Sequence, residues 1–427
     1  MLDEITRAVL ARVEANREAI LEDVSACVRI PSVVGHEGPA QAYMQSIFER
    51  EHLDLDVFEA DLAQVSSHPA FVRSPWDTKD RPNVVGTLRG TRENAPSLAL
   101  NGHIDVVSPE PVSAWTHDPW GAERVVVDGE ERLYGRGALD MKSGTVANLH
   151  ALKAVIDAGF RPRGTVSVQS VVEEEAGGGA GTLATLLRGH TASALLNSEP
   201  FNRTIVLGQP GLMLFRVSVE GMTAHAAYSQ RGVNAIGKLL PLYEAMIALD
   251  AERAARWVDP FFGALSDRAV NLNIGTFRAG DWPSTVPGSA EMECRISFIP
   301  PQSQAEVRSE VESRIANVAA ADPWLRDHPP SVEWFGWQAD PWRQDTADPF
   351  IQTLGRVVTE VAGEVPPMVS ATAGLDARLC GSFGIPAACI GAHGANMHGA
   401  DEYVVVDSVI ETVKIVAATI VAWCGVD

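Results

Sequence analysis

The stretch that decides the fold is SLALNGHID at residues 97–105, an apolar run that ends in His103 and Asp105. Apolar side chains without polar alternation are typical of a strand that is buried on both faces of a sheet. Three later runs have the same form, apolar first and ionisable at the end: SVQSVVEEE at 167–175, SALLNSEP at 193–200 and PAACIGAHGANMHGADE at 386–402.

Helical patterns separate these runs. MKSGTVANLHALKAVIDAGF at 141–160 predicts a helix that ends near Gly159, and DPFIQTLGRVVTEVAG at 348–363 predicts another. Strands that alternate with helices predict an α/β fold with a mostly parallel sheet and helices on both faces. Ligands bind beyond the carboxyl ends of the strands in such a sheet, so the terminal acids and histidines are expected to converge there.

The middle of the chain has a different order of elements. Between residues 210 and 325, two helical patterns alternate with three strand-like runs in the order β-α-β-β-α. This order is typical of a small sandwich with helices on one face. We therefore predict an inserted α+β domain at 210–325, and a discontinuous main domain formed by 1–209 and 326–427.

Charge and cysteine content exclude several classes of protein. The 427 residues carry a formal net charge of −21, which argues against a nucleic-acid partner. The five cysteines are scattered and form no CxxC pair, which favours free thiols in a reducing compartment and argues against a cysteine-ligated zinc. They are Cys27, Cys294, Cys380, Cys389 and Cys424.

Neither end of the sequence predicts a membrane segment. Charged residues interrupt MLDEITRAVLARVEANREAI at 1–20, so this segment resembles an amphipathic helix without the apolar core of a signal peptide. The apolar segment at 408–426 contains Glu411 and Lys414, and we expect it to be a helix of the core. We therefore expect a cytoplasmic protein.

The residues at the strand ends suit a metal site. Two histidines and three carboxylates from five segments, with Asp140 from the loop LYGRGALDMKSG, are ligands that zinc prefers, and cobalt and manganese also fit. Five protein ligands exceed the usual three of one catalytic zinc, so a pair of metals that share a carboxylate explains the number better. The candidate ligands are His103, Asp140, Glu175, Glu199 and His398.

Two further acids have predicted roles beside the metals. Asp105 follows His103 by two residues, so in an extended segment its carboxylate faces the same way and can orient the imidazole. Neighbouring side chains of the Glu173–Glu175 run point apart, so Glu175 can bind metal while Glu174 serves as general base and then general acid.

Together, GHIDVV, YGRGALDMKSG, EEEAGGG, SEP and HGADE resemble the family of acetylornithine deacetylase, succinyl-diaminopimelate desuccinylase, aminoacylase and glutamate carboxypeptidase. The resemblance covers nearly the whole chain, with the motifs in order. It implies a zinc-peptidase-like fold, two metals bridged by Asp140, and His103 with Glu199 on one metal. The resemblance places Glu175 with His398 on the other metal.

The resemblance also implies roles for residues outside the metal set. His225, in GMTAHAAYSQRGVNAI, would stabilise the oxyanion in the active site of a partner subunit, so a homodimer through 210–325 is expected. Arg295 in ECRISF, and Arg378 in LDARLC, would hold a substrate carboxylate.

The predicted function is a metal-dependent hydrolase that cleaves an amide-type C–N bond in a small carboxylate-bearing substrate, as an N-acyl amino acid deacylase does. A dipeptidase or carboxypeptidase, or an aminohydrolase that deaminates a small molecule, could use the same two metals. A non-catalytic carboxylate-binding protein is the third reading, and the presence of Glu174 argues against it because a binding protein does not need that acid.

Overall fold

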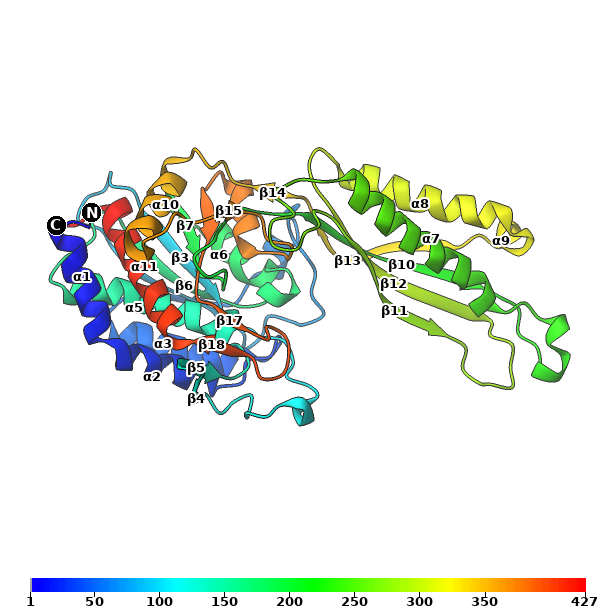
Figure 1. Ribbon diagram of the computed structural model, residues 1–427, viewed down its shortest axis with the longest axis horizontal. Helices are drawn as coiled ribbons and strands as arrows, with labels where there is room; N and C mark the ends of the chain where they lie inside the picture. Colours follow the sequence, from blue (N-terminus) through cyan, green and yellow to red (C-terminus); the bar gives the residue numbers. More distant parts are fainter. Residues whose placement is uncertain (1) are drawn as a thin grey trace. The chain divides into compact units, whose positions relative to one another are not determined.

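The computed structural model describes residues 2–427, which form two compact units. The first unit contains the carboxyl-terminal part of the chain as well as the amino-terminal half, as Figure 1 shows in blue to green and in orange to red. The first unit comprises Met1–Leu207, Gln344–Val369 and Leu375–Asp427, and the second comprises Gly208–Arg343 and Ser370–Gly374.

The first unit is built on an eight-stranded sheet. Its central strands β6, β3, β7 and β16 are parallel to one another. Every residue of β3 is buried, so both faces of the sheet are covered. The predicted α/β class is therefore confirmed. Across the sheet the strands are β1 (Asp54–Phe58), β2 (Asn83–Leu88), β6 (Val166–Val171), β3 (Leu98–His103), β7 (Leu195–Asn197), β16 (Ala387–Cys389), β8 (Ile205–Val206) and β15 (Met368–Val369).

Helices cover this sheet, and several of them pack around the terminal helix α11. The terminal helix α11 contacts α1, α5 and α10, which Figure 1 shows on the same side of the unit. Among the helices of residues 2–427, none combines the length and the hydropathy of a membrane-spanning segment. The helices are α1 (Glu4–Ala15), α2 (Arg17–Val28), α3 (Gly38–Arg50), α4 (Leu62–Val65), α5 (Ser143–Asp157), α6 (Ala184–Leu187), α10 (Pro349–Ala362) and α11 (Val406–Cys424).

A small antiparallel sheet in the first unit was not predicted. Its strands lie in the order β17 (Gly394–Ala395), β18 (Tyr403–Val405), β5 (Glu130–Tyr134) and β4 (Glu123–Val127). Because β18 pairs with β5, the loop that follows β17 lies beside the loop that follows β5. These two loops carry His398 and Asp140, so the small sheet helps to position the site.

The second unit has two long helices, α7 (Ala235–Arg256) and α8 (Gln304–Ala321), beside a four-stranded antiparallel sheet (Figure 1). Alternate residues of β10 and β12 join α7 and α8 in one hydrophobic core. The sheet order is β11 (Leu272–Ala279), β12 (Ser289–Phe298), β10 (Gly211–Glu220) and β13 (Ser331–Ala339); α9 (Pro323–Asp327), β9 (Gly208–Gln209) and β14 (Trp342–Arg343) complete the unit.

The second unit extends further along the chain than the predicted domain at 210–325. It continues to Arg343 and takes in Ser370–Gly374 as well. The physical reason is β13, which pairs with β10 along most of its length and so belongs to this sheet. These residues lie in the predicted main domain, 326–427, so the observed second unit is larger than the predicted one.

Candidate metal centre

The parallel strands of the first unit bring ionisable side chains to one edge of the sheet. His103 is the last residue of β3, and Glu199 follows β7 by two residues. Glu174 and Glu175 begin a single turn of helix shortly after β6. Because β3 lies between β6 and β7 and is parallel to both, these side chains emerge side by side.

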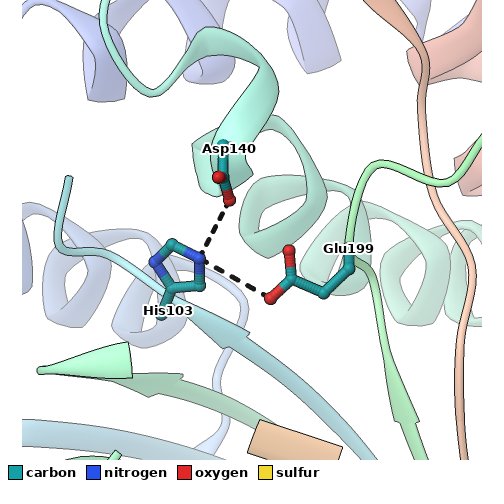
Figure 2. Close-up of side chains that lie close together, drawn as sticks. All are labelled: His103, Asp140 and Glu199. Atoms are coloured by element: carbon teal, nitrogen blue, oxygen red, sulfur yellow. Dashed lines mark hydrogen bonds and ion pairs between the residues drawn. The ribbon is translucent and has the colours of Figure 1, made fainter. Parts of the chain in front are cut away.

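The first group of candidate ligands consists of His103, Asp140 and Glu199. Figure 2 shows their side chains turned toward one another. His103 Nε2 lies 3.2 Å from Asp140 Oδ1 and 3.6 Å from Glu199 Oε1. One ligand atom from each residue lies within 4.8 Å of the others, which is close enough for one ion to touch all three.

The second group consists of Asp140, Glu175 and His398. His398 Nε2 lies 3.3 Å from Asp140 Oδ2 and 3.1 Å from Glu175 Oε1. The side chain of His398 is 50% exposed, so this group borders solvent, whereas the His103 side chain is buried. Asp140 turns one carboxylate oxygen toward each histidine, so it is common to both groups.

The chemistry of these groups fits divalent cations. Glu199 Oε1 is buried without a hydrogen-bond partner within the described residues, and such an oxygen needs a positive neighbour. Burial raises the pKa of Glu199 well above its usual range, and the nearby Asp140 and Glu175 add to the rise. Hydrogen bonds to Asp140 and Glu175 raise the pKa of His398 to about 10. The raised pKa of His398 reflects the negative charge of Asp140 and Glu175 beside it, and a site of this kind suits a cation.

Glu174 lies in the same cluster and is buried. Burial raises its pKa well above the usual range, His103 opposes that rise, and Glu199 and Asp376 reinforce it. A carboxyl group with a raised pKa can both accept and return a proton near neutral pH. Its position beside the ligands and its protonation behaviour therefore suit a general acid and base.

Asp105 is buried beside His103, and its carboxylate has backbone partners in addition to the imidazole. His103 Nδ1 lies 2.9 Å from the backbone oxygen of Asp105 and 3.6 Å from its Oδ1. The carboxylate accepts the backbone N–H groups of Glu174 at 3.2 Å and of Glu175 at 3.1 Å. Asp105 thus links the ends of β3 and β6, a contact that the spacing of His103 and Asp105 did not reveal.

A buried network of charged residues holds Glu173, the residue that precedes the Glu174 turn. Glu173 has a left-handed backbone, with φ of 68°, and its carboxylate accepts from Arg81 at 3.2 Å and from the Ala180 N–H at 3.3 Å. Arg81 in turn makes a bidentate pair with Glu37, at 2.7 Å for both contacts. Arg81 and Glu37 were not among the predicted site residues, because neither lies in a strand-end motif.

Asp376 is a further buried acid at the site that sequence reasoning missed. Burial raises its pKa, and its Oδ2 accepts the Thr182 hydroxyl at 2.7 Å. Gly178 has a φ of 69°, and a Cβ there would lie 1.9 Å from Asp376 Oδ1, so only glycine fits. The predicted Arg378 is mostly buried and donates to the Gly177 carbonyl at 2.8 Å. Burial lowers the pKa of Arg378.

The remaining two predicted residues belong to the second unit. His225 is exposed and caps a short helix, where its Nδ1 accepts the Ala227 N–H at 3.1 Å. Arg295 lies on β12 and donates to Asn271 Oδ1 at 2.8 Å and to the Thr372 carbonyl at 3.2 Å. Burial lowers the pKa of Arg295.

Comparison with known proteins identifies the family. Residues 99–422 match peptidase family M20/M25/M40, and because this match covers most of the chain, the chain belongs to that family. N-formyl-4-amino-5-aminomethyl-2-methylpyrimidine deformylase from Halalkalibacterium halodurans is 27% identical over 98% of this chain and 98% of its own length.

Two solved structures share the fold. A dipeptidase from Saccharomyces cerevisiae has a TM-score of 0.75 at 13% identity and covers 98% of this chain and 98% of its own. A dinuclear metal-binding peptidase from Bacillus subtilis has a TM-score of 0.66 at 15% identity and covers 96% of this chain and 99% of its own. The family and these relatives make the chain an enzyme that hydrolyses amide bonds.

Proposed function

We propose that this chain removes a small acyl group from the nitrogen of a small molecule, with the help of two divalent metal ions. The observation that carries the proposal is the shared carboxylate, since Asp140 turns one oxygen to each of two ligand groups. The proposed ligands are His103, Asp140 and Glu199 for one ion, and Asp140, Glu175 and His398 for the other.

Zinc is the proposed metal, since two imidazoles and three carboxylates are ligands that it prefers, and cobalt or manganese would also fit. When bound, such ions polarise a carbonyl group and lower the pKa of water. The chain itself supplies the proton transfer. Glu174 takes a proton from the attacking water and returns it to the leaving nitrogen, in agreement with its burial and raised pKa.

An N-acyl amino acid is the first proposed substrate. Its carboxylate would pair with a guanidinium, and Arg378 in the first unit and Arg295 in the second unit are the two candidates. Both are largely buried, and a partly desolvated guanidinium binds a carboxylate more strongly than an exposed one does. Asp105 is proposed to hold the Glu174 turn and the His103 imidazole in place during the reaction.

A formamide is the second proposed substrate, and the full-length similarity to a deformylase favours it. The name of the deformylase gives an N-formyl aminopyrimidine as its substrate, and that name contains no carboxylate group. Hydrolysis of an N-formyl amine therefore would not require the guanidinium groups. The two proposed substrates thus differ in how much their turnover depends on Arg378. Arg378→Met should weaken turnover of an N-acyl amino acid more than that of a formamide.

The second unit is proposed to form a homodimer, in which His225 of one protomer would help to stabilise the oxyanion in the other. Large apolar side chains are exposed on its helix α7 and strand β11, including Leu240, Ile247 and Phe277. Exposed apolar side chains on adjacent elements are typical of an interface. We also propose a cytoplasmic enzyme, since all five cysteines are free and buried.

The test measures metal content by mass spectrometry and hydrolysis of a panel of N-formyl, N-acetyl and N-succinyl compounds and dipeptides. Wild type is compared with Asp140→Ala, Glu174→Gln and Asp281→Ala, an exposed acid of the second unit that serves as the control. We expect about two ions per chain in wild type and in Glu174→Gln.

Asp140→Ala should lose both the metal and the activity. Glu174→Gln should retain the metal but turn over about 10²-fold to 10⁴-fold more slowly. Wild-type protein without bound metal, or Asp140→Ala with unchanged metal content, would contradict the proposal. If the product is ammonia and no carboxylic acid is released, the chain is an aminohydrolase and the proposed deacylase activity is wrong.

A further inference from the structure

A buried ion pair joins the two loops that carry Asp140 and His398. Glu402 is completely buried, and Arg136 is 2% exposed. Arg136 Nη1 donates to Glu402 Oε2 at 2.5 Å. The residues lie far apart in the sequence, and the pairing of β18 with β5 brings them together.

Each member of this pair also holds the backbone of the other loop. Glu402 Oε1 accepts the N–H groups of Leu139 at 3.0 Å and of Asp140 at 3.1 Å. Arg136 Nη2 donates to the carbonyl oxygen of Gly399 at 2.9 Å, next to His398. The contacts are therefore reciprocal: the acid of the His398 loop holds Asp140, and the arginine of the Asp140 loop holds the neighbour of His398.

Asp401 Oδ1 also ties this loop to a neighbouring segment, since it accepts the N–H groups of Thr116 at 2.7 Å and of His117 at 3.0 Å, but neither contact involves His398 itself. The side chain of His398 is 50% exposed, and its backbone is left-handed, with a φ of 61°. Asn396 and Asp401 in the same loop are also left-handed, so no regular strand or helix supports the imidazole. By contrast, His103 is the last residue of β3 and is bonded into the sheet.

We propose that Arg136 and Glu402 are positioning residues that set the distance between Asp140 and His398, and thereby the affinity of the second ligand group for its metal ion. The inference rests on the proposed two-metal site. Two of the three ligands in the second group lie on the loops that this pair joins. In the first group only Asp140 does, so the two groups should respond unequally to a change in the pair.

Arg136→Lys is the sharpest test. Lysine keeps the positive charge beside Glu402 but lacks the planar fork that reaches the Gly399 carbonyl at the same time. Glu402 can still accept the two N–H groups of the Asp140 loop, so the first ligand group should stay intact. Loss of an outer contact of this kind lowers metal affinity about 10-fold to 100-fold.

Arg253 offers a matched control in the second unit. It is also buried, pairs with Glu310, and donates to a backbone carbonyl, that of Ser297, at 3.0 Å. Arg253→Lys therefore imposes the same chemical change on the same kind of contact, away from the ligand groups. Any general loss of stability from a buried arginine should appear in both variants.

The experiment is a calorimetric titration of Zn²⁺ into metal-free protein, for wild type, Arg136→Lys and Arg253→Lys, with His398→Ala as the reference for loss of the second ion. In Arg136→Lys we expect the weaker dissociation constant to rise about 10-fold or more, while the tighter one changes less than about 3-fold. Arg253→Lys should change neither. Glu402→Gln provides a second variant should Arg136→Lys fail to fold.

Each other outcome has a definite meaning. If wild type binds two ions and Arg136→Lys binds them with the same two dissociation constants, the inference is wrong but the two-metal site is supported. Equal losses in Arg136→Lys and Arg253→Lys would show a general effect of stability, and would overturn it too. Fewer than two ions bound by wild type would refute the proposed site itself, and the inference with it.

Discussion

Asp23 lies on helix α2, distant in the sequence from the ligand loops. Its contacts predict how the free energy of unfolding depends on pH. Its carboxylate accepts from His150 Nε2 at 2.8 Å, from Arg50 Nη2 at 2.5 Å and from the Tyr43 hydroxyl at 2.9 Å. The Asp23 side chain is 11% exposed, whereas that of Arg50 is 50% exposed. The carboxylate thus joins α2 to α3 and α5, and Asp23→Asn removes its charge without changing its size.

The magnitude follows from these three contacts. Burial would raise the pKa of Asp23, but the hydrogen bonds from His150, Arg50 and Tyr43 outweigh it and hold the pKa well below the usual range. A buried hydrogen bond to a charged group contributes about 1.5–3 kcal/mol, and the half-exposed Arg50 contributes only a few tenths because water screens it. We therefore expect Asp23→Asn to lower the free energy of unfolding by about 3 kcal/mol at pH 7.

The pH dependence has a definite sign. A carboxylate whose pKa is lowered in the folded state stabilises the fold above its unfolded pKa, which is about 3.9, and loses that contribution as the pH falls. The ionisation of Asp23 should therefore contribute the same amount to the difference between wild type and Asp23→Asn at pH 7 and at pH 5. At pH 3 this contribution should be smaller by about 1.3 kcal/mol.

Urea unfolding followed by circular dichroism at pH 7, 5 and 3 measures this difference. Asp54→Asn is the control, because Asp54 and its partner Arg89 are 65% and 82% exposed. Loss of that pair should cost less than about 0.5 kcal/mol. A difference for Asp23→Asn that is the same at pH 7 and pH 3, or below about 1 kcal/mol at pH 7, would refute the argument.

Three further predictions concern other parts of the chain. His398→Ala should lose about one of two bound ions, as measured by mass spectrometry; loss of both would mean that the groups are not separable. Gly144→Ala should destabilise the fold by about 1–3 kcal/mol, because a Cβ there would lie 2.1 Å from the Ser198 carbonyl oxygen; an unchanged thermal midpoint would contradict this. Ser303→Ala removes the capping box of α8 and should cost about 1 kcal/mol in urea unfolding, whereas Ser303→Asp should not.

Much of the site was predictable because it follows from strand direction. His103 and Glu199 were found as ionisable residues after apolar runs, and the structure places both at one edge of the sheet. This succeeded because a parallel sheet sends all its carboxyl ends to the same side, whatever its loops do. Asp140 lies on a loop and was found as a further acid in LYGRGALDMKSG, and the family resemblance then implied its bridging role.

The contacts that hold the site were not predictable in the same way. The carboxylate of Asp105 binds backbone N–H groups of Glu174 and Glu175, and backbone groups leave no trace in a sequence. Asp376 stands in no strand-end motif, and only the folded chain brings it beside Thr182. β13 follows α9 after the turn signal Pro329-Pro330, but its sequence does not reveal that it pairs with β10, so the predicted boundary at 325 differs from the observed one.

The two ligand groups differ in how the chain supports them, and this difference bears on how such an enzyme can change. His103 is part of the ladder of β3, so moving it would disturb the core of the first unit. His398 lies in a loop with several left-handed residues, which Arg136 and Glu402 join to the Asp140 loop. If the proposed two-metal site is correct, substitutions around this loop should therefore change the affinity of the second ligand group for its ion while the core stays folded. The second ligand group is then the part of the proposed site where metal affinity can change with the smallest loss of stability.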